Sequence, residues 1–180
     1  MKSYILITIL FLFTGCSIKY NKVQVSHNNP NAIKLTNMLT SMDKSIDKNE
    51  AKDLAVFSLR YTKELANSYG LVLSPNFQNF LINIGLKKKG YCYNYADDLG
   101  NALVKRGYKS FDIYRMIHKQ GTMFEHNSVM ITPHYTTKKG VILDGWRNAG
   151  KLYFARLKDD KKSYDWKIFK PLSVKSQKRY

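Results

Sequence analysis

Apolar residues recur at the spacing of an α-helix over much of the chain before Gly107. In the last of these stretches the apolar side chains follow one another at intervals of 4, 3 and 4 positions, which places them on one helical face. This helix begins at Cys92, and an earlier, shorter helix begins at Ser74-Pro75. The four predicted helices cover residues 32–46, 50–69, 74–84 and 92–106.

After Gly107 the pattern changes to short segments that are rich in β-branched and aromatic residues. Glycine, proline or lysine bounds each segment. The order of helices first and strands afterwards predicts an α+β fold, in which N-terminal helices and the central helix opened by the cysteine pack on an antiparallel sheet. The predicted strands are FDIYRMI, HNSVMIT, GVILDGW and DWKIFKPL, at residues 111–117, 126–132, 140–146 and 165–172.

The first residues have the layout of a secretory signal, with a positive charge at Lys2 and an almost wholly apolar run from Tyr4 to Phe13. This run is shorter than the roughly 20 residues that a membrane-spanning helix needs. A buried N-terminal helix is the alternative interpretation. The polar residues that follow show little periodicity and predict a tether. The chain thus divides into a signal peptide at 1–15, a tether at 16–31 and one domain at 32–180.

The stretch Phe13-Thr14-Gly15-Cys16 resembles the lipobox of bacterial lipoproteins, with phenylalanine in place of the usual leucine. The resemblance implies that the mature chain begins at Cys16 and that acyl chains on this cysteine hold it on a membrane. Ser17 follows the cysteine. In lipoproteins of double-membraned bacteria, this residue implies the outer membrane, with the domain facing the periplasm.

Composition fits a single exported domain and adds a strong positive charge. Removal of the signal leaves 165 of 180 residues, and 44% of all residues are hydrophobic, which suits one domain with a core and excludes a disordered chain. The formal net charge of +17 predicts an anionic partner. Export argues against nucleic acid, so an anionic envelope polymer, anionic lipid or an acidic protein fits better. The alternative is that lysine only keeps the surface soluble.

Cys92 is one of only 2 cysteines, and it has no partner within the chain if Cys16 carries lipid. A lone thiol in an exported protein forms an intermolecular bridge, fills the core or reacts as a nucleophile. The first turn of a helix favours the thiolate, because unpaired N–H groups and the positive end of the helix dipole meet there. The apolar face on which Cys92 lies equally permits simple packing.

A reactive thiol needs a base and a group that orients the base. Among the 4 histidines, His126 begins a predicted strand, where its ring would be held rigidly. Asp144 interrupts an apolar strand, where a carboxylate needs a partner. The two residues are centred on Tyr135, so strands that pair about this centre place them directly opposite each other. The alternative is an ordinary loop aspartate and a hairpin in another register.

The segments GYCYNYADDLGNAL, EHNSVMI and VILDGW resemble, in this order, the transglutaminase-like superfamily of papain-type folds. The resemblance covers about residues 75–155. It implies that Cys92 is the nucleophile, His126 the base and Asp144 the orienting acid. The Cys92 N–H and an upstream polar side chain would bind the oxyanion. The candidates for that side chain are Gln78, Asn79 and Asn83. Tyr91 would flank the site, and Trp146 would either line it or lie in the core. Arg147 would either bind an acidic group of the substrate or lie on the surface.

The sequence therefore predicts a lipid-anchored cysteine hydrolase or acyl transferase that acts on a peptide or protein substrate without a cofactor or metal. The second interpretation is a non-catalytic basic lipoprotein that keeps the fold and binds an anionic envelope component or a protein partner. Residues 156–180, with nine Lys or Arg against three Asp, suit the second interpretation.

Overall fold

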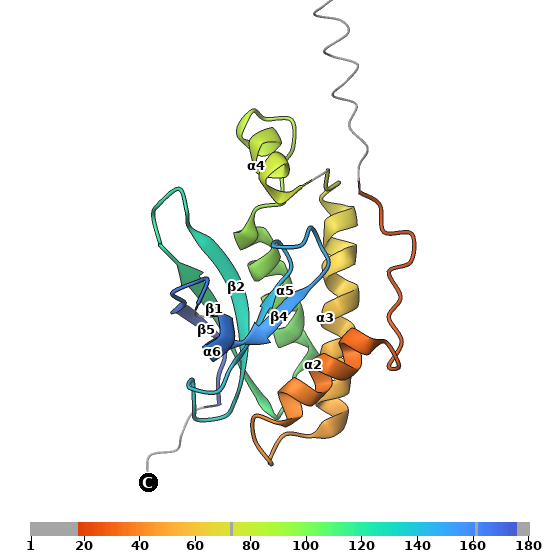
Figure 1. Ribbon diagram of the computed structural model, residues 1–180, viewed down its shortest axis with the longest axis vertical. Helices are drawn as coiled ribbons and strands as arrows, with labels where there is room; N and C mark the ends of the chain where they lie inside the picture. The colour runs from red at the N-terminus through yellow and green to blue at the C-terminus, as the bar shows by residue number, and fades with distance from the viewer. Residues whose placement is uncertain (1–17, 73, 161, 176–180) are drawn as a thin grey trace, which may run out of the picture.

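The computed structural model describes residues 18–72, 74–160 and 162–175, which form helices and a five-stranded antiparallel sheet (Figure 1). The predicted α+β fold is confirmed. The helices are α2 (Pro30–Thr40), α3 (Lys48–Ser68), α4 (Pro75–Asn83), α5 (Cys92–Arg106) and α6 (Leu157–Asp160). The strands are β1 (Phe111–His118), β2 (His126–Pro133), β3 (Val141–Asp144), β4 (Tyr153–Arg156) and β5 (Lys167–Ser173).

The strands lie in the order β4-β3-β2-β1-β5, and every neighbouring pair is antiparallel. Strands β1 to β4 form a meander, and β5 returns to the opposite edge to pair with β1. The pairing of β1 with β2 runs from Phe111 opposite Pro133 to His118 opposite His126. The end of β1 and the start of β2 therefore lie at the same end of the sheet, which is also where Cys92 of α5 lies against Asn127.

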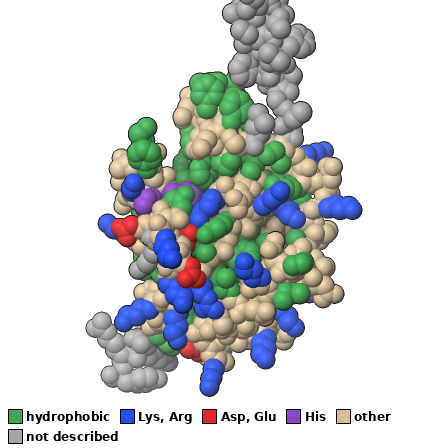
Figure 2. Space-filling model, viewed as in Figure 1, with side chains coloured by type: hydrophobic (Ala, Val, Ile, Leu, Met, Phe, Trp, Pro, Cys, Tyr) green, Lys and Arg blue, Asp and Glu red, His purple; other side chains and the backbone are tan. Residues whose placement is uncertain are grey.

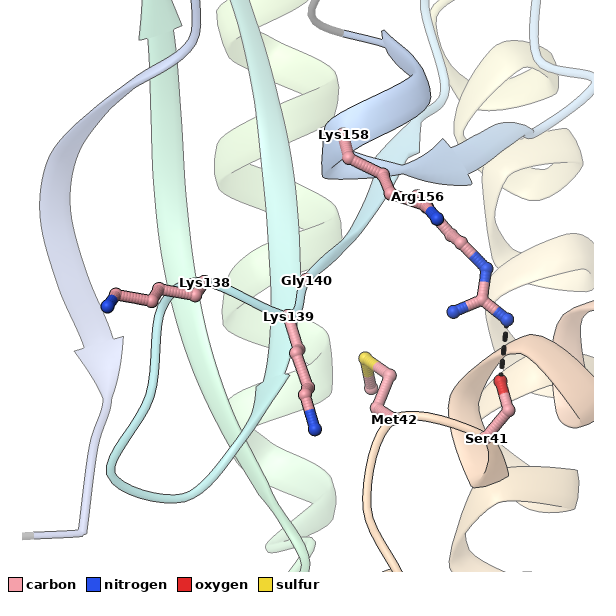
Figure 3. A pocket seen from close by; sticks show the side chains of 7 residues that line it. All are labelled: Ser41, Met42, Lys138, Lys139, Gly140, Arg156 and Lys158. Atoms are coloured by element: carbon pink, nitrogen blue, oxygen red, sulfur yellow. Dashed lines mark hydrogen bonds between the residues drawn. The ribbon is translucent and has the colours of Figure 1, made fainter.

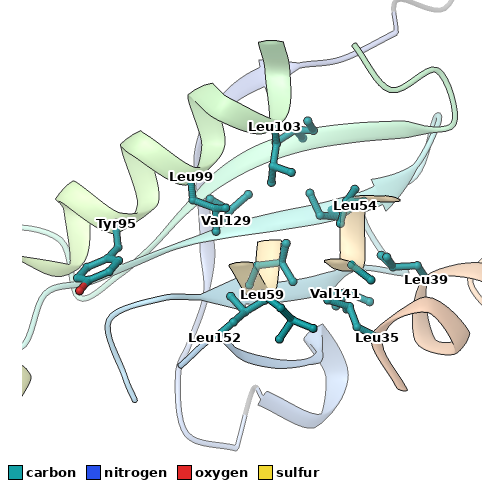
Figure 4. Close-up of a cluster of buried hydrophobic side chains, with 14 of the residues drawn as sticks. Leu35, Leu39, Leu54, Leu59, Tyr95, Leu99, Leu103, Val129, Val141 and Leu152 are labelled. Atoms are coloured by element: carbon teal, nitrogen blue, oxygen red, sulfur yellow. The ribbon is translucent and has the colours of Figure 1, made fainter. Parts of the chain in front are cut away.

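Helices cover one face of the sheet and bury the larger of two hydrophobic clusters (Figure 4). α5 packs on β1 and β2, and α3 packs against α5 and α2. Val129 of β2 and Val141 of β3 belong to this cluster together with Leu54 of α3 and Leu99 of α5. The alternation of side chains along a strand sends their neighbours to the other face. That face carries the smaller cluster, which consists of Met116, Met130, Ile142, Leu157 and Trp166.

Side-chain caps explain where the helices begin. The Asp47 carboxylate accepts hydrogen bonds from the N–H groups of Asn49 (2.7 Å) and Glu50 (2.9 Å) at the start of α3. Ser74 caps α4, in which Pro75 takes the first position. The prediction of a helix over residues 32–46 is wrong at its end, because α2 stops at Thr40. The following residues bury their apolar side chains from an irregular turn.

The described part of the expected tether lies on the domain rather than away from it. The N–H of Ile18 donates to the carbonyl of Leu71 at 2.7 Å. Tyr20 donates its N–H to Asn67 Oδ1 at 2.8 Å and its hydroxyl to the Ala149 carbonyl at 2.6 Å. Hydrogen bonds therefore hold this segment on the domain, and the weak hydrophobic periodicity of the segment did not predict them.

The sequence did not predict strand β4, which is short and only half-buried. The proposed signal peptide and Cys16 lie outside the described residues. Within the described ranges, none of the helices combines the length and the apolar character needed to cross a membrane.

Candidate active site

Cys92 is the first residue of α5 and follows a turn that Asn94 and Gly90 define. Asn94 Oδ1 accepts hydrogen bonds from the N–H groups of Gly90 (3.0 Å) and Tyr91 (3.1 Å). Gly90 has φ 134°, and a Cβ at this position would lie 2.6 Å from Cγ of Gln78. Both observations require glycine here. Among the described residues, nothing accepts a hydrogen bond from the Cys92 N–H, so it is available to an oxyanion.

The Cys92 thiol is free and buried, with 8% of the residue exposed, yet it lines a cleft of about 340 Å³. Asn127 Nδ2 donates to the sulfur at 3.8 Å, and the carbonyl oxygen of Glu125 lies 3.9 Å from it. The cleft walls come from α4, from the connection between β1 and β2, and from Trp146 and Tyr164. Figure 1 shows α4 and this connection at the same end of the molecule.

His126 lines the same cleft and is hydrogen-bonded to Asp144, with 2.6 Å between Nε2 and Oδ2. Their side chains are only 5% and 1% exposed. Because Nε2 is used by Asp144, Nδ1 is the ring nitrogen left for the thiol. The three residues that the sequence singled out as nucleophile, base and orienting acid therefore lie together.

The predicted register about Tyr135 is wrong. Val129 pairs with Leu143 and Ile131 pairs with Val141. The hairpin is therefore centred on Thr136, one residue after the predicted centre. Continued along the strands, this pairing sets Asp144 opposite Ser128 instead of His126. A shift of two positions keeps both side chains on one face, so His126 and Asp144 meet diagonally.

The surroundings of His126 favour its charged form. Burial alone lowers the pKa of His126, but the hydrogen bond to Asp144 and the neighbouring Cys92 thiol outweigh it and raise this pKa to about 9. Burial alone raises the pKa of Asp144, but the hydrogen bond with His126 and the charge of Arg147 hold it below its usual value. The two shifts together favour an ionised Asp144 beside a protonated His126.

Arg147 links the Asp144 carboxylate to a second, unpredicted carboxylate, that of Asp160. Its Nε donates to Asp144 Oδ2 at 3.0 Å, and its two terminal nitrogens donate to Asp160 at 2.8 and 3.1 Å. Asp144 Oδ1 accepts the N–H groups of Trp146 and Arg147, which folds this turn back onto the carboxylate. The expectation that Arg147 lies on the surface or binds substrate is wrong, because its guanidinium is used inside the protein.

Aromatic rings enclose the imidazole. The ring centre of His126 lies 5.1 Å from that of Trp146, 4.9 Å from Tyr164 and 5.5 Å from Trp166. Trp166 Nε1 also donates to Asp160 at 2.7 Å. These rings exclude water from the His126–Asp144 hydrogen bond, which strengthens it. Trp146 is thus both a wall of the cleft and a packing partner of His126.

Gln78 is not part of the cleft. Its Oε1 accepts the Val72 N–H, and its Nε2 donates to the carbonyls of Tyr69 and Lys89. The amide is therefore used to hold the turn before α5, and the expectation of an oxyanion role for it is wrong.

Two further candidates also have structural partners. The hydroxyl of Tyr91 bonds to Asn83, outside the cleft. Asn79 does line the cleft, where its Oδ1 accepts the Trp146 Nε1–H at 3.4 Å. Of the three upstream candidates that the sequence offered, Asn79 is the one that lines the cleft.

Sequence reasoning missed Asn127, which contacts the thiol. Its side chain also donates to Glu125 Oε1 at 2.9 Å and accepts from Arg115 at 3.0 Å. Arg115 in turn pairs with Asp97 of α5 at 2.8 Å. A polar residue at an inward position of a predicted strand was the available signal, because such a residue needs a partner. Asp160 gave no comparable signal, since it stands in a charged stretch of the sequence.

A second histidine–aspartate pair lies far from the cysteine. His134 Nδ1 lies 2.6 Å from Asp112 Oδ1, the same separation as in the first pair. His134 directly follows the last residue of β2, at the end of the strand away from His126, and it does not line the cleft. Over the described residues, no group of three or more His, Cys, Asp or Glu side chains is placed to hold a metal ion.

Comparisons of the chain with protein-family models, with curated proteins and with solved structures found no match. The transglutaminase-like resemblance therefore stays a prediction that rests on the motifs and on the geometry of the site.

Proposed function

We propose that this chain is a cysteine hydrolase or acyl transferase of the transglutaminase-like type, acting on an amide bond of a peptide or protein. One observation carries the proposal. The His126–Asp144 hydrogen bond of 2.6 Å stands in the wall of a cleft that also contains Cys92, at the first residue of a helix. Within the described residues no cysteine accompanies the pair formed by His134 and Asp112, so the thiol is what distinguishes the first pair.

The proposed reaction proceeds through a thioester. The Cys92 sulfur, as thiolate, attacks the carbonyl carbon of the substrate amide, and the new oxyanion accepts a hydrogen bond from the Cys92 N–H. The carbon–nitrogen bond then breaks, and the proton of the His126 imidazolium goes to the leaving amine. Water or a second amine attacks the thioester carbonyl carbon and gives its proton to His126. The carbon–sulfur bond then breaks, the acyl product leaves, and the Cys92 sulfur returns to the thiolate. Water yields peptidase or amidase chemistry, and an amine yields acyl transfer.

The proposed location is the outer membrane of a bacterial envelope, with lipid on Cys16 and the domain facing the periplasm. The sequence pattern before Cys16 supports this location. A lone thiol is compatible with export when it is enclosed, and Cys92 is buried. No cofactor enters the proposed mechanism.

Thiol labelling tests the proposed catalytic pair. At neutral pH we expect iodoacetamide to alkylate Cys92 at least about tenfold faster in the wild type than in His126→Ala, because the imidazolium stabilises the reacting thiolate. His134→Ala is the matched control, since it removes a histidine from an equally short His–Asp hydrogen bond elsewhere. This control should label at the wild-type rate. Equal rates for the wild type and His126→Ala would contradict the proposed role of His126.

A basic binding protein is the second candidate function. It is favoured by a pocket lined with four cationic side chains, which does not share residues with the cleft. The two functions differ in their need for the thiol. A binding function survives Cys92→Ala in cells, whereas the proposed hydrolase loses its phenotype and forms no acyl-enzyme detectable by mass spectrometry.

A further inference from the structure

A basic pocket of about 220 Å³ lies beyond the end of the sheet opposite the candidate active site. Lys138 and Lys139 come from the connection between β2 and β3, Arg156 from the end of β4, and Lys158 from α6. The cleft lies at the start of β2, whereas the connection from β2 to β3, which carries Lys138 and Lys139, follows the end of β2. The eight residues of β2 separate the two places by about 25 Å.

In the described part of the chain, the four cations have no carboxylate in direct contact. Within residues 18–72, 74–160 and 162–175, none of these side chains makes an ion pair with a carboxylate. Hydrogen bonds from Ser45 and, to a smaller extent, the charge of Lys139 lower the pKa of Asp43, but Asp43 is not within ion-pair distance of this lysine. Unpaired cations that surround a concave surface attract an anion into it.

Figure 3 shows how the cationic groups are spread around the pocket. Lys139 and Arg156 lie on either side of Met42, and the Lys138 side chain extends away from both. The guanidinium of Arg156 is held in place by a hydrogen bond of 2.8 Å to the Ser41 hydroxyl. Because the charged groups do not converge on one point, they fit an anion with several charges along its length better than a single small ion.

We propose that this pocket binds a soluble phosphate-bearing anion with several charges, such as a phosphodiester or polyphosphate chain. Arg156 donates hydrogen bonds to one phosphate, and the lysines neutralise its neighbours. The proposal does not depend on the catalytic function proposed for Cys92. Figure 2 shows Lys and Arg side chains spread over the face in view, and the proposal gives four of the positive charges behind the net charge of +17 a specific site.

Binding of tripolyphosphate to the full chain, measured by calorimetry at low salt, tests the proposal. The test variant is Lys139→Gln with Lys158→Gln, because both residues are exposed and their loss leaves Arg156 and the fold in place. We expect its Kd to rise about five- to tenfold. The matched control is Lys52→Gln with Lys105→Gln, which removes the same charge from exposed positions on α3 and α5. Its Kd should change less than about twofold.

Three results would overturn the proposal. Equal weakening in both double variants means that general charge, and not the pocket, binds the probe. Inorganic orthophosphate that binds as tightly as tripolyphosphate contradicts a ligand with several charges. Binding to phosphatidylglycerol vesicles without binding to tripolyphosphate assigns the surface to a lipid headgroup instead of a soluble anion. Tripolyphosphate binding that only the pocket variant weakens supports the proposal.

Discussion

At the scale of single residues, we expect Asp160 to control how much of the Asp144 charge acts on His126. Arg147 lies between the two carboxylates and donates to both. One guanidinium between two carboxylates leaves one negative charge in excess, and this excess favours a positive imidazole ring. Without Asp160, the whole charge of Arg147 would act on Asp144. We therefore expect Asp160 to act on the His126 ring through Arg147.

We expect Asp160→Asn to lower the pKa of His126 towards its ordinary value of 6.5, because Arg147 then neutralises Asp144. A fall by one unit corresponds to about a tenfold loss of imidazolium above that pKa. The measurement is the pH profile of Cys92 alkylation, whose upper limb should move to lower pH. Tyr153→Phe is the control, since it removes a neutral hydrogen bond to Asp160 and keeps the charge. An unshifted profile in folded Asp160→Asn contradicts this role.

At the scale of elements, the turn before α5 places the thiol, and its glycine is the sensitive point. We expect Gly90→Ala to lower the free energy of unfolding by about 2–4 kcal/mol, because it combines a positive φ with a Cβ only 2.6 Å from Gln78 Cγ. Gly85→Ala is the matched control. It also has a positive φ, of 79°, but nothing lies within 4 Å of its Cβ, so it should cost about 1 kcal/mol. Urea denaturation measures both, and equal losses would show that the contact with Gln78 is unimportant.

The sequence predicted the types of most elements because their patterns are local. Helical spacing and capping residues located α3, α4 and α5 to within a few residues, and β-rich segments located β1, β2, β3 and β5. Strand β4 escaped because YFAR is short, half-buried and without clear alternation. The predicted centre of the β2–β3 hairpin was wrong by one residue. The conformation of the loop sets the register, and Tyr135 adopts φ 62° in this loop.

The site was predictable only where chemistry imposes a strong local requirement. A cysteine at a helix start, a histidine at a strand start and an aspartate in an apolar strand each stand out from their neighbours. Asn127 shows only as a polar residue at an inward strand position, and Asp160 does not stand out at all, because its partners come near only through tertiary packing. Gln78 was misassigned for the same reason, since sequence does not show which backbone groups use a buried amide.

At the scale of the whole molecule, the candidate active site ties stability to pH. The pKa of His126 is raised from 6.5 to about 9, so the folded state binds a proton that the unfolded state releases between these values. The stabilisation is fully present below about pH 6.5 and is lost as the pH rises through 9. It amounts to about 3 kcal/mol. At acidic pH the opposite loss sets in, because the lowered pKa values of Asp144 and Asp160 favour folding only while both are ionised.

We therefore expect the free energy of unfolding of the wild type to fall between pH 6.5 and 9, and that of His126→Gln to fall much less. Urea denaturation at a series of pH values measures both curves. The series should stop at pH 9, since raised tyrosine pKa values such as that of Tyr108 add a further dependence at higher pH. The neutral glutamine cannot bind the proton, so the difference between the two curves isolates the contribution of His126. Parallel curves across this window would mean that the imidazole gains no proton affinity on folding, which would remove the electrostatic basis for a thiolate at Cys92.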